Sequence, residues 1–159
     1  MVYTWMDSPV GRLLIAGDEA GLRHVLFAEG RGEARPQPGW QEDPRALAEP
    51  VRQLHAYFAG ELRRFDLVTT PQGTAFQRRV WDELLQIPYG ETVSYGELAQ
   101  RVGTPNGSRA VGLANGANPI SIVIPCHRVI GSNGKLTGYG GGLRNKEWLL
   151  AHEGARRLW

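Results

Sequence analysis

The sequence predicts an α+β fold, with a small β-rich N-terminal domain followed by a mainly helical domain that contains a helix-turn-helix. In the first 28 residues, short apolar runs alternate with the turn-like segments D-S-P-V-G and G-D-E-A-G, as in antiparallel strands. Further along, two capping boxes each precede apolar residues at helical spacing. We place the linker in T-T-P-Q-G, which divides the chain into domains 1–70 and 71–159.

In the N-terminal domain we expect an antiparallel meander of three strands over residues 2–6, 12–16 and 22–28. Residues 31–40 are predicted to be a loop. Asp43-Pro44 has the form of a helix start, and the helical pattern from Leu47 to Phe58, with a kink at Pro50, ends at Gly60. Residues 64–70 could form one more strand.

The C-terminal domain is predicted to hold four helices. Thr74 and Gln77 begin the first, and Ser94 and Glu97 begin the second. Ser108 is the predicted N-cap of the third helix, after the turn G-T-P-N-G. The run 121–130 is expected to be a buried strand. A glycine-rich loop over residues 131–143 then leads to a closing helix over residues 146–154.

Composition excludes several classes of protein. With 42% hydrophobic and 21% charged residues, the chain can bury a core, and no run approaches the ~20 apolar residues of a membrane span. A single cysteine can form neither an internal disulfide nor a multi-cysteine metal site, and no secretory signal is visible, so we expect a cytoplasmic protein. The net charge of +2 is weak evidence for a nucleic-acid partner.

The segment from Ser94 to Asn118 has the length of a helix-turn-helix, and its helix-capping and turn residues are spaced as in that motif. Its second helix is poor in bulky side chains, which favours either close packing against another helix or entry into a nucleic-acid groove, normally the major groove. Arg109 would then be the one long basic side chain at the start of that helix. Few of its side chains could read base edges, so contacts to shape and phosphates are the better expectation.

Cys126 is followed directly by His127 in I-V-I-P-C-H-R-V-I. A histidine can take the proton of a thiol and so make it nucleophilic, but for a bare Cys-His pair a buried structural cysteine is the commoner case. Adjacent residues of a strand point to opposite faces, so a direct bond between the two requires a bridging water or a turn at Pro125-Cys126. Glu147 and Glu153 are both candidates to orient the histidine, and spacing does not choose between them.

Three motifs together resemble the O6-alkylguanine-DNA alkyltransferases, also called methylated-DNA–protein-cysteine methyltransferases. The motifs are R-A-V-G-L-A-N-G-A-N-P, I-P-C-H-R-V-I and Y-G-G-G-L-R-N-K-E-W-L-L-A-H-E-G, and the resemblance covers residues 71–155. It implies a ribonuclease H-like N-terminal domain, no cofactor, and single-use, irreversible transfer of an alkyl group from O6-alkylguanine, and from O4-alkylthymine, to Cys126. His127 would act as base through a water, Glu153 would orient it, and Asn118 would be the hinge before the active-site strand.

The resemblance also implies how DNA is bound. The helix-turn-helix would enter the minor groove, against the general expectation, and flip the damaged base out of the duplex. Arg109 would intercalate in the vacated space, and Tyr95 would assist flipping; the other implied DNA-binding residues are Ser94, Ala110 and Gly112. The implied pocket for the base consists of Tyr95, Val129, Tyr139, Gly140 and Gly141. The implied partner is double-stranded DNA carrying O6-alkylguanine, bound by a monomer, with cooperative assembly on DNA as an option.

The sequence departs from the family pattern in two ways. Some members hold zinc in the N-terminal domain with cysteine and histidine ligands, which this chain cannot reproduce, so we expect no metal site and ordinary roles for His24 and His55. Gly140 stands where many relatives have serine, which puts the tolerance of bulky alkyl groups in doubt. Two other functions fit the sequence less well: a damage-binding alkyltransferase-like protein would lack Cys126, and an unrelated cysteine hydrolase would not need a helix-turn-helix.

Overall fold

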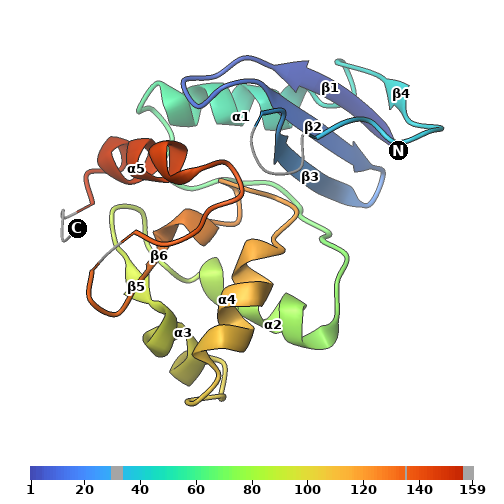
Figure 1. The fold of residues 1–159 in the computed structure, drawn as a ribbon. Coiled ribbons are helices and arrows are strands. Elements are labelled where there is room, and N and C mark those ends of the chain that lie inside the picture. The colour runs from blue at the N-terminus through green and yellow to red at the C-terminus, as the bar shows by residue number, and fades with distance from the viewer. Residues whose placement is uncertain (30–33, 135, 156–159) are drawn as a thin grey trace.

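The computed structural model describes residues 1–29, 34–134 and 136–155 and confirms the α+β architecture (Figure 1). The N-terminal strands are β1 (Val2–Met6), β2 (Leu13–Asp18) and β3 (Gly21–Phe27), which pair as the predicted antiparallel meander. A two-residue strand that the sequence did not reveal, β4 (Gln41–Glu42), pairs in parallel with β1, so the order is β3-β2-β1-β4. It follows the predicted loop 31–40, of which residues 31–33 lie outside the described part of the chain.

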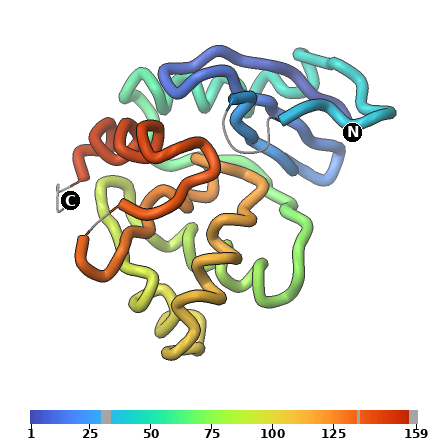
Figure 2. The backbone as a smooth tube through the Cα atoms, viewed as in Figure 1, coloured from blue at the N-terminus to red at the C-terminus, as the bar shows by residue number. Residues whose placement is uncertain are grey.

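The outer edge of β3 is covered by two segments from further along the chain. Residues 64–70 do not form the predicted strand; they touch β3 through a single bridge between Leu22 and Thr69. Residues 119–121 pair with the rest of the edge. The Val25 N–H donates to the Pro119 carbonyl over 3.0 Å, and the Val25 carbonyl accepts from the Ser121 N–H over 3.1 Å. In Figure 2 the chain leaving α4 returns to this edge, so the two domains are joined by backbone hydrogen bonds.

Helix α1 (Ala48–Phe58) covers the N-terminal sheet and begins later than predicted. The Asp43 carboxylate accepts from the Ala46 N–H over 3.2 Å, as an N-cap side chain does, but residues 44–47 form a turn and the regular helix begins at Ala48. Pro50 lies in the first helical turn, where its missing N–H removes no intrahelical bond. Gly60, with φ of 78°, follows the end of the helix as predicted.

In the part of the C-terminal domain that the structure describes, the α-helices are α2 (Ala75–Leu84), α3 (Tyr95–Arg101), α4 (Ser108–Gly116) and α5 (Leu143–His152). Both predicted capping boxes are present, at Thr74 and at Ser94. The prediction for Ser108 is wrong: Gly107 occupies the N-cap, since its carbonyl accepts the first helical bond, from the Val111 N–H over 2.9 Å. Helices α3 and α4 pack together as the predicted helix-turn-helix.

The run 121–130 is buried as predicted but is not a strand. Ile122 has a φ of 73° at the centre of a turn, Cys126–Arg128 form a short 3₁₀ helix, and only β6 (Val129–Ile130) is extended, parallel to β5 (Val93–Ser94). The Asn118 side chain explains the difference, because it donates to the Ile124 carbonyl over 2.8 Å and accepts from the Ile120 N–H over 3.0 Å. Local bonds therefore satisfy backbone groups that a strand would pair with a neighbour.

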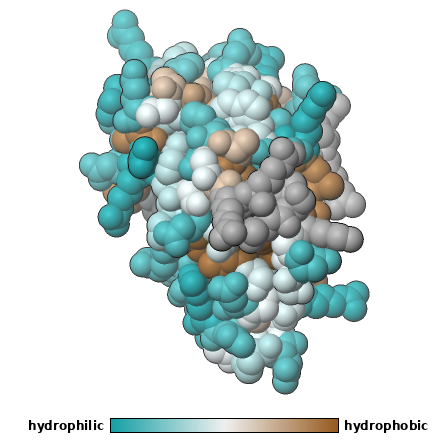
Figure 3. Space-filling model, turned by 90° about the vertical axis from the view of Figure 1, so that its left-hand side faces the viewer, coloured by the Kyte–Doolittle hydropathy of each residue, from teal (hydrophilic) through white to brown (hydrophobic). Residues whose placement is uncertain are grey.

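A continuous apolar core runs from the N-terminal sheet to the C-terminal helices. On the face shown in Figure 3, hydrophilic residues predominate and apolar ones are confined to small separate areas. Among the helices described, none has the length and apolar character that crossing a membrane would need.

Candidate active site

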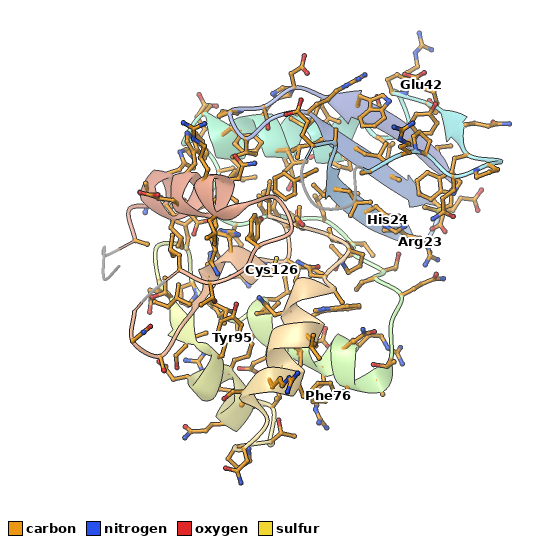
Figure 4. All side chains as sticks on the ribbon, in the orientation of Figure 1. Arg23, His24, Glu42, Phe76, Tyr95 and Cys126 are labelled. Atoms are coloured by element: carbon orange, nitrogen blue, oxygen red, sulfur yellow. The ribbon has the colours of Figure 1, made fainter. Side chains whose placement is uncertain are left out.

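Cys126 lies where the two domains meet, between the N-terminal sheet and the C-terminal helices (Figure 4). Its side chain is 5% exposed and lines a cavity of about 160 Å³, called here the Cys126 cavity. The C-terminal domain contributes Asn118, Ser121, Tyr139 and Gly140 to its wall, among others, and the N-terminal domain contributes Leu26, Phe27 and Ala34. A nearly buried thiol therefore faces a small, partly open space that can receive a small group.

Behind the thiol, the Glu153 carboxylate is saturated with hydrogen bonds. It accepts from His127 Nε2 over 2.8 Å, from Tyr57 Oη over 2.7 Å, and from Arg128 Nε and Nη2 over 2.8 and 2.9 Å. Burial raises the pKa of this carboxyl group, but the hydrogen bonds from His127 and Arg128 and the guanidinium charge of Arg128 outweigh it and hold the pKa well below its ordinary range. Glu153 is therefore an anion, although it sits at the C-terminal end of α5, where the helix dipole disfavours negative charge.

The bond to Glu153 fixes the tautomer of His127. Burial lowers the pKa of this fully buried ring, so it is neutral at pH 7. Because an ionised carboxylate can only accept, Nε2 must carry the proton and donate it, which leaves Nδ1 with a free lone pair. Nδ1 is buried and, within the described residues, has no hydrogen-bond partner. An unprotonated nitrogen is thus held in the same 3₁₀ turn as the thiol.

Burial raises the pKa of the Cys126 thiol, while a hydrogen bond from Asn118 and the nearby Lys146 ammonium oppose that rise. The thiol is therefore protonated at neutral pH and needs a base. Lys146 is itself buried: its Nζ donates to the Val129 carbonyl over 2.6 Å and to the Thr137 carbonyl over 3.1 Å. Burial lowers the pKa of Lys146 to about 8.

Two asparagines fix the turn that carries the cysteine. Asn118 holds the backbone before Cys126 through its hydrogen bonds to Ile120 and Ile124. Asn115, on α4, donates to the Cys126 carbonyl over 3.3 Å, and its Oδ1 is buried without a partner in the part of the chain described. The backbone of Cys126 is consequently coupled to the second helix of the helix-turn-helix.

The exposed face of α4 carries Arg109, Ala110 and Leu113, and Leu113 is 72% exposed. Gly112 faces α3, since a Cβ placed there would lie 3.7 Å from the ring of Tyr95.

The Tyr95 hydroxyl accepts from Thr137 Oγ1 over 3.1 Å, which joins α3 to the glycine-rich loop, defined from here as residues 131–142. Lys135 of this loop is outside the described residues. Ser94 is half-buried, and its hydroxyl accepts from the Glu97 N–H over 3.0 Å.

The structure brings together only some of the expected pocket residues. Tyr139 and Gly140 line the Cys126 cavity. Val129 is fully buried beside it in β6, and Gly141 faces the ring of Phe27. Tyr95 approaches the glycine-rich loop from the side of the helix-turn-helix.

Sequence reasoning missed several residues that surround Cys126. Tyr57 and Phe27 come from the N-terminal domain, which appeared to offer only support, and nothing in the local sequence marks them. Lys146 is buried too, but it stands in the polar segment R-N-K-E, where nothing in the local sequence marks it. Arg128 is different, because it is a basic residue inside an otherwise apolar run, and such a residue becomes buried only if it is paired. That signal was available in the sequence.

The two histidines of the N-terminal sheet and helix, His24 and His55, have different surroundings. His24 packs against Trp40 with ring centroids 5.4 Å apart, and His55 is exposed. The residues that are described contain no group of three histidine, cysteine or acidic side chains able to hold a metal ion.

Comparison with known proteins identifies the family. Residues 75–155 match the family model described as 6-O-methylguanine DNA methyltransferase, DNA binding domain, and residues 1–71 match the ribonuclease-like domain of the same enzymes. The methylated-DNA–protein-cysteine methyltransferase of Methanosarcina acetivorans is 54% identical over 155 residues, covering 98% of this chain and 99% of that protein. That of Mycolicibacterium paratuberculosis is 56% identical over 151 residues, covering 95% and 91%.

A solved structure agrees with these sequence matches. The crystal structure of Mycobacterium tuberculosis OGT in complex with DNA superposes with a TM-score of 0.91 at 52% identity, covering 97% of this chain and 93% of that one. Both domains and the arrangement between them are therefore shared with these relatives, and the chain belongs to the 6-O-methylguanine DNA methyltransferase family.

Proposed function

We propose that this protein repairs DNA by direct reversal, moving an alkyl group from O6 of guanine to the sulfur of Cys126. The observation that carries the proposal is the buried thiol on the wall of a small cavity, in one turn with a neutral histidine whose Nε2 is bound to an ionised glutamate. The matching relatives are named for this same transfer. The thioether formed is stable and the site offers no means to hydrolyse it, so each molecule acts once.

In the transfer step, Nδ1 of His127 takes the thiol proton through a bridging water. The Cys126 thiolate then attacks the carbon attached to O6; a carbon–sulfur bond forms while the carbon–oxygen bond breaks. The bonding electrons pass to O6, and the purine takes up a proton to become ordinary guanine. Glu153 stabilises the imidazolium that forms during proton transfer, and Asn118 holds the turn in place.

The alkyl carbon is inaccessible inside a duplex, so the nucleotide must be flipped into the Cys126 cavity. In this proposal α4 lies in the minor groove with the small exposed residue Ala110 against the DNA, and Arg109 fills the gap left by the flipped base. Gly112, which faces Tyr95, would keep α4 close to α3 beside the DNA. Tyr95 and Ser94 would lie beside the displaced strand at the start of α3. Tyr139 and Gly140 would enclose the base, with Val129 and Gly141 behind them.

The partner in this proposal is double-stranded DNA carrying O6-alkylguanine, and O4-alkylthymine is a second substrate. One relative has been crystallised with DNA. We further propose that the protein acts as a monomer in the cytoplasm, with domains 1–70 and 71–159. Cooperative assembly on DNA is the remaining option.

Mass spectrometry tests the function directly. The protein is mixed with a duplex containing one O6-methylguanine, and its peptides are weighed after digestion. We expect one added methyl group on the peptide that contains Cys126, rising to one per protein and then stopping. Cys126→Ser should keep DNA binding and gain no methyl group. Continued turnover would contradict the proposal, and binding without an adduct would favour a damage-binding protein instead.

A further inference from the structure

The N-terminal domain makes direct contact with the glycine-rich loop. Phe27, the last residue of β3, is 8% exposed and lines the Cys126 cavity. Its ring meets Tyr139 edge to face, with centroids 5.5 Å apart and planes at 72°. The wall of the cavity thus combines an aromatic ring from each domain.

The same ring leaves no space for a side chain at Gly141. A Cβ built on Gly141 would lie 2.7 Å from two atoms of the Phe27 ring, which is closer than real contacts allow. A Cβ on the preceding Gly140 would meet nothing within 4 Å. The backbone of the glycine-rich loop therefore lies directly on Phe27 at Gly141.

A second contact fixes the loop at the same residue. The side-chain amide of Asn145 donates to the Gly141 carbonyl over 2.8 Å and to the Val10 carbonyl over 3.0 Å. Val10 belongs to the connection between β1 and β2. Two separate parts of the N-terminal sheet thus hold the loop that forms one side of the cavity.

We propose that the N-terminal domain, through Phe27, sets the size of the alkyl group that the site accepts. This inference rests on the proposed transfer to Cys126. The Phe27 ring fills the space into which a larger alkyl group, or the loop itself, would have to move. Because Asn145 and Phe27 both act at Gly141, the loop cannot retreat to enlarge the cavity without losing both contacts. Phe27 is a positioning residue: in this proposal it acts through the loop and the cavity wall.

Phe27→Leu tests the proposal, since leucine keeps the core apolar while removing the edge of the ring. Two duplexes of identical sequence carry either O6-methylguanine or O6-benzylguanine, so DNA contacts cancel in the ratio of the two transfer rates. We expect the benzyl-to-methyl ratio to rise by about tenfold or more, since one methylene group of pocket space changes discrimination by about 10- to 200-fold. Trp5→Leu, which alters an aromatic residue of the same sheet that packs on Arg12, is the matched control. Its ratio should equal that of the unaltered protein.

Gly141→Ala supplies the opposite change. Its Cβ must displace the Phe27 ring or push the loop into the cavity, so methyl transfer should slow by at least about fivefold, as for an overpacked core. Adding Phe27→Leu should restore most of the rate, because the two changes act on one contact.

The outcomes separate the two claims. A benzyl-to-methyl ratio in Phe27→Leu within twofold of the unaltered protein, or one shifted toward methyl, overturns the role of Phe27 while leaving the transfer itself intact. An unaltered protein that places no methyl group on Cys126 overturns the proposed function. Lack of rescue in the double variant shows that Phe27 does not restrict the loop.

Discussion

Replacing Glu153 with glutamine would test the central feature of the site, because it removes the charge while keeping the shape. The carboxylate accepts four hydrogen bonds, two of them from Arg128. The glutamine amide can accept with its oxygen only, and its NH₂ group would face donors. The Arg128 guanidinium would also remain buried without an opposite charge. Loss of one partner from a buried ion pair costs about 3–5 kcal/mol, so we expect the free energy of unfolding to fall by that amount.

The transfer rate should fall as well. Without the carboxylate, His127 is free to carry its proton on Nδ1, and that tautomer cannot take the proton of the thiol. General-base assistance contributes about 10²–10⁴ in rate, and we expect a loss within this range. Single-turnover transfer from a duplex with O6-methylguanine, followed by quenching and peptide mass measurement, gives the rate. Only protein shown to be folded by circular dichroism is used.

Tyr57→Phe is the matched control, since it removes one donor to the same carboxylate and leaves the charge. A hydrogen bond to a charged group contributes about 1.5–3 kcal/mol, so this variant should lose less stability than Glu153→Gln and keep most of its transfer rate. If folded Glu153→Gln transfers methyl groups at the unaltered rate, the reasoning about the histidine tautomer is refuted. Equal losses in both variants would refute the role assigned to the charge.

Three other outcomes follow from the structure. Arg109→Ala should slow transfer from duplex DNA at least tenfold more than transfer from free O6-benzylguanine, and equal slowing would contradict intercalation. The pKa of Glu153 is lower in the folded chain than its ordinary value of 4.5. The ionised carboxylate therefore stabilises the folded state above pH 4.5, and this stabilisation is lost progressively as the pH falls below 4.5. The difference in unfolding free energy between unaltered protein and Glu153→Gln, measured in urea, should therefore shrink by about 1.4 kcal/mol per pH unit below pH 4.5; a constant difference from pH 6 to 3 would contradict this. Because the Cys126 cavity is only about 160 Å³, an S-benzyl group should lower the melting temperature more than an S-methyl group, and equal melting temperatures would argue against a rigid cavity.

The elements that were predicted correctly are those determined by interactions between residues close together in the sequence. The capping boxes at Thr74 and Ser94 depend on bonds within four residues, and both helices begin there. The meander depends on turns between adjacent strands. The N-cap predicted at Ser108 was wrong by one residue, because the first helical bond of α4 ends on the Gly107 carbonyl and Ser108 is already helical.

The segment with Cys126 shows where local patterns fail. Its apolar character correctly predicted burial, but burial alone does not distinguish a strand from a packed turn. The decisive bonds come from Asn118, whose partners lie up to six residues further along. The donors around Glu153 are separated from it by as many as 96 residues, as with Tyr57, and no periodicity in one sequence reports such a contact.

The shared edge of β3 has a consequence for how the chain folds. Val25 pairs with residues 119–121, so during synthesis the N-terminal sheet waits for most of the chain before this edge is closed. Until then an unpaired backbone edge, flanked by the core residues Leu22 and Val25, is open to pairing with other chains. The ribonuclease-like segment expressed alone would keep that edge permanently. Although the family models divide the chain near residue 71, the C-terminal segment closes the backbone edge of β3, so the two segments should unfold together.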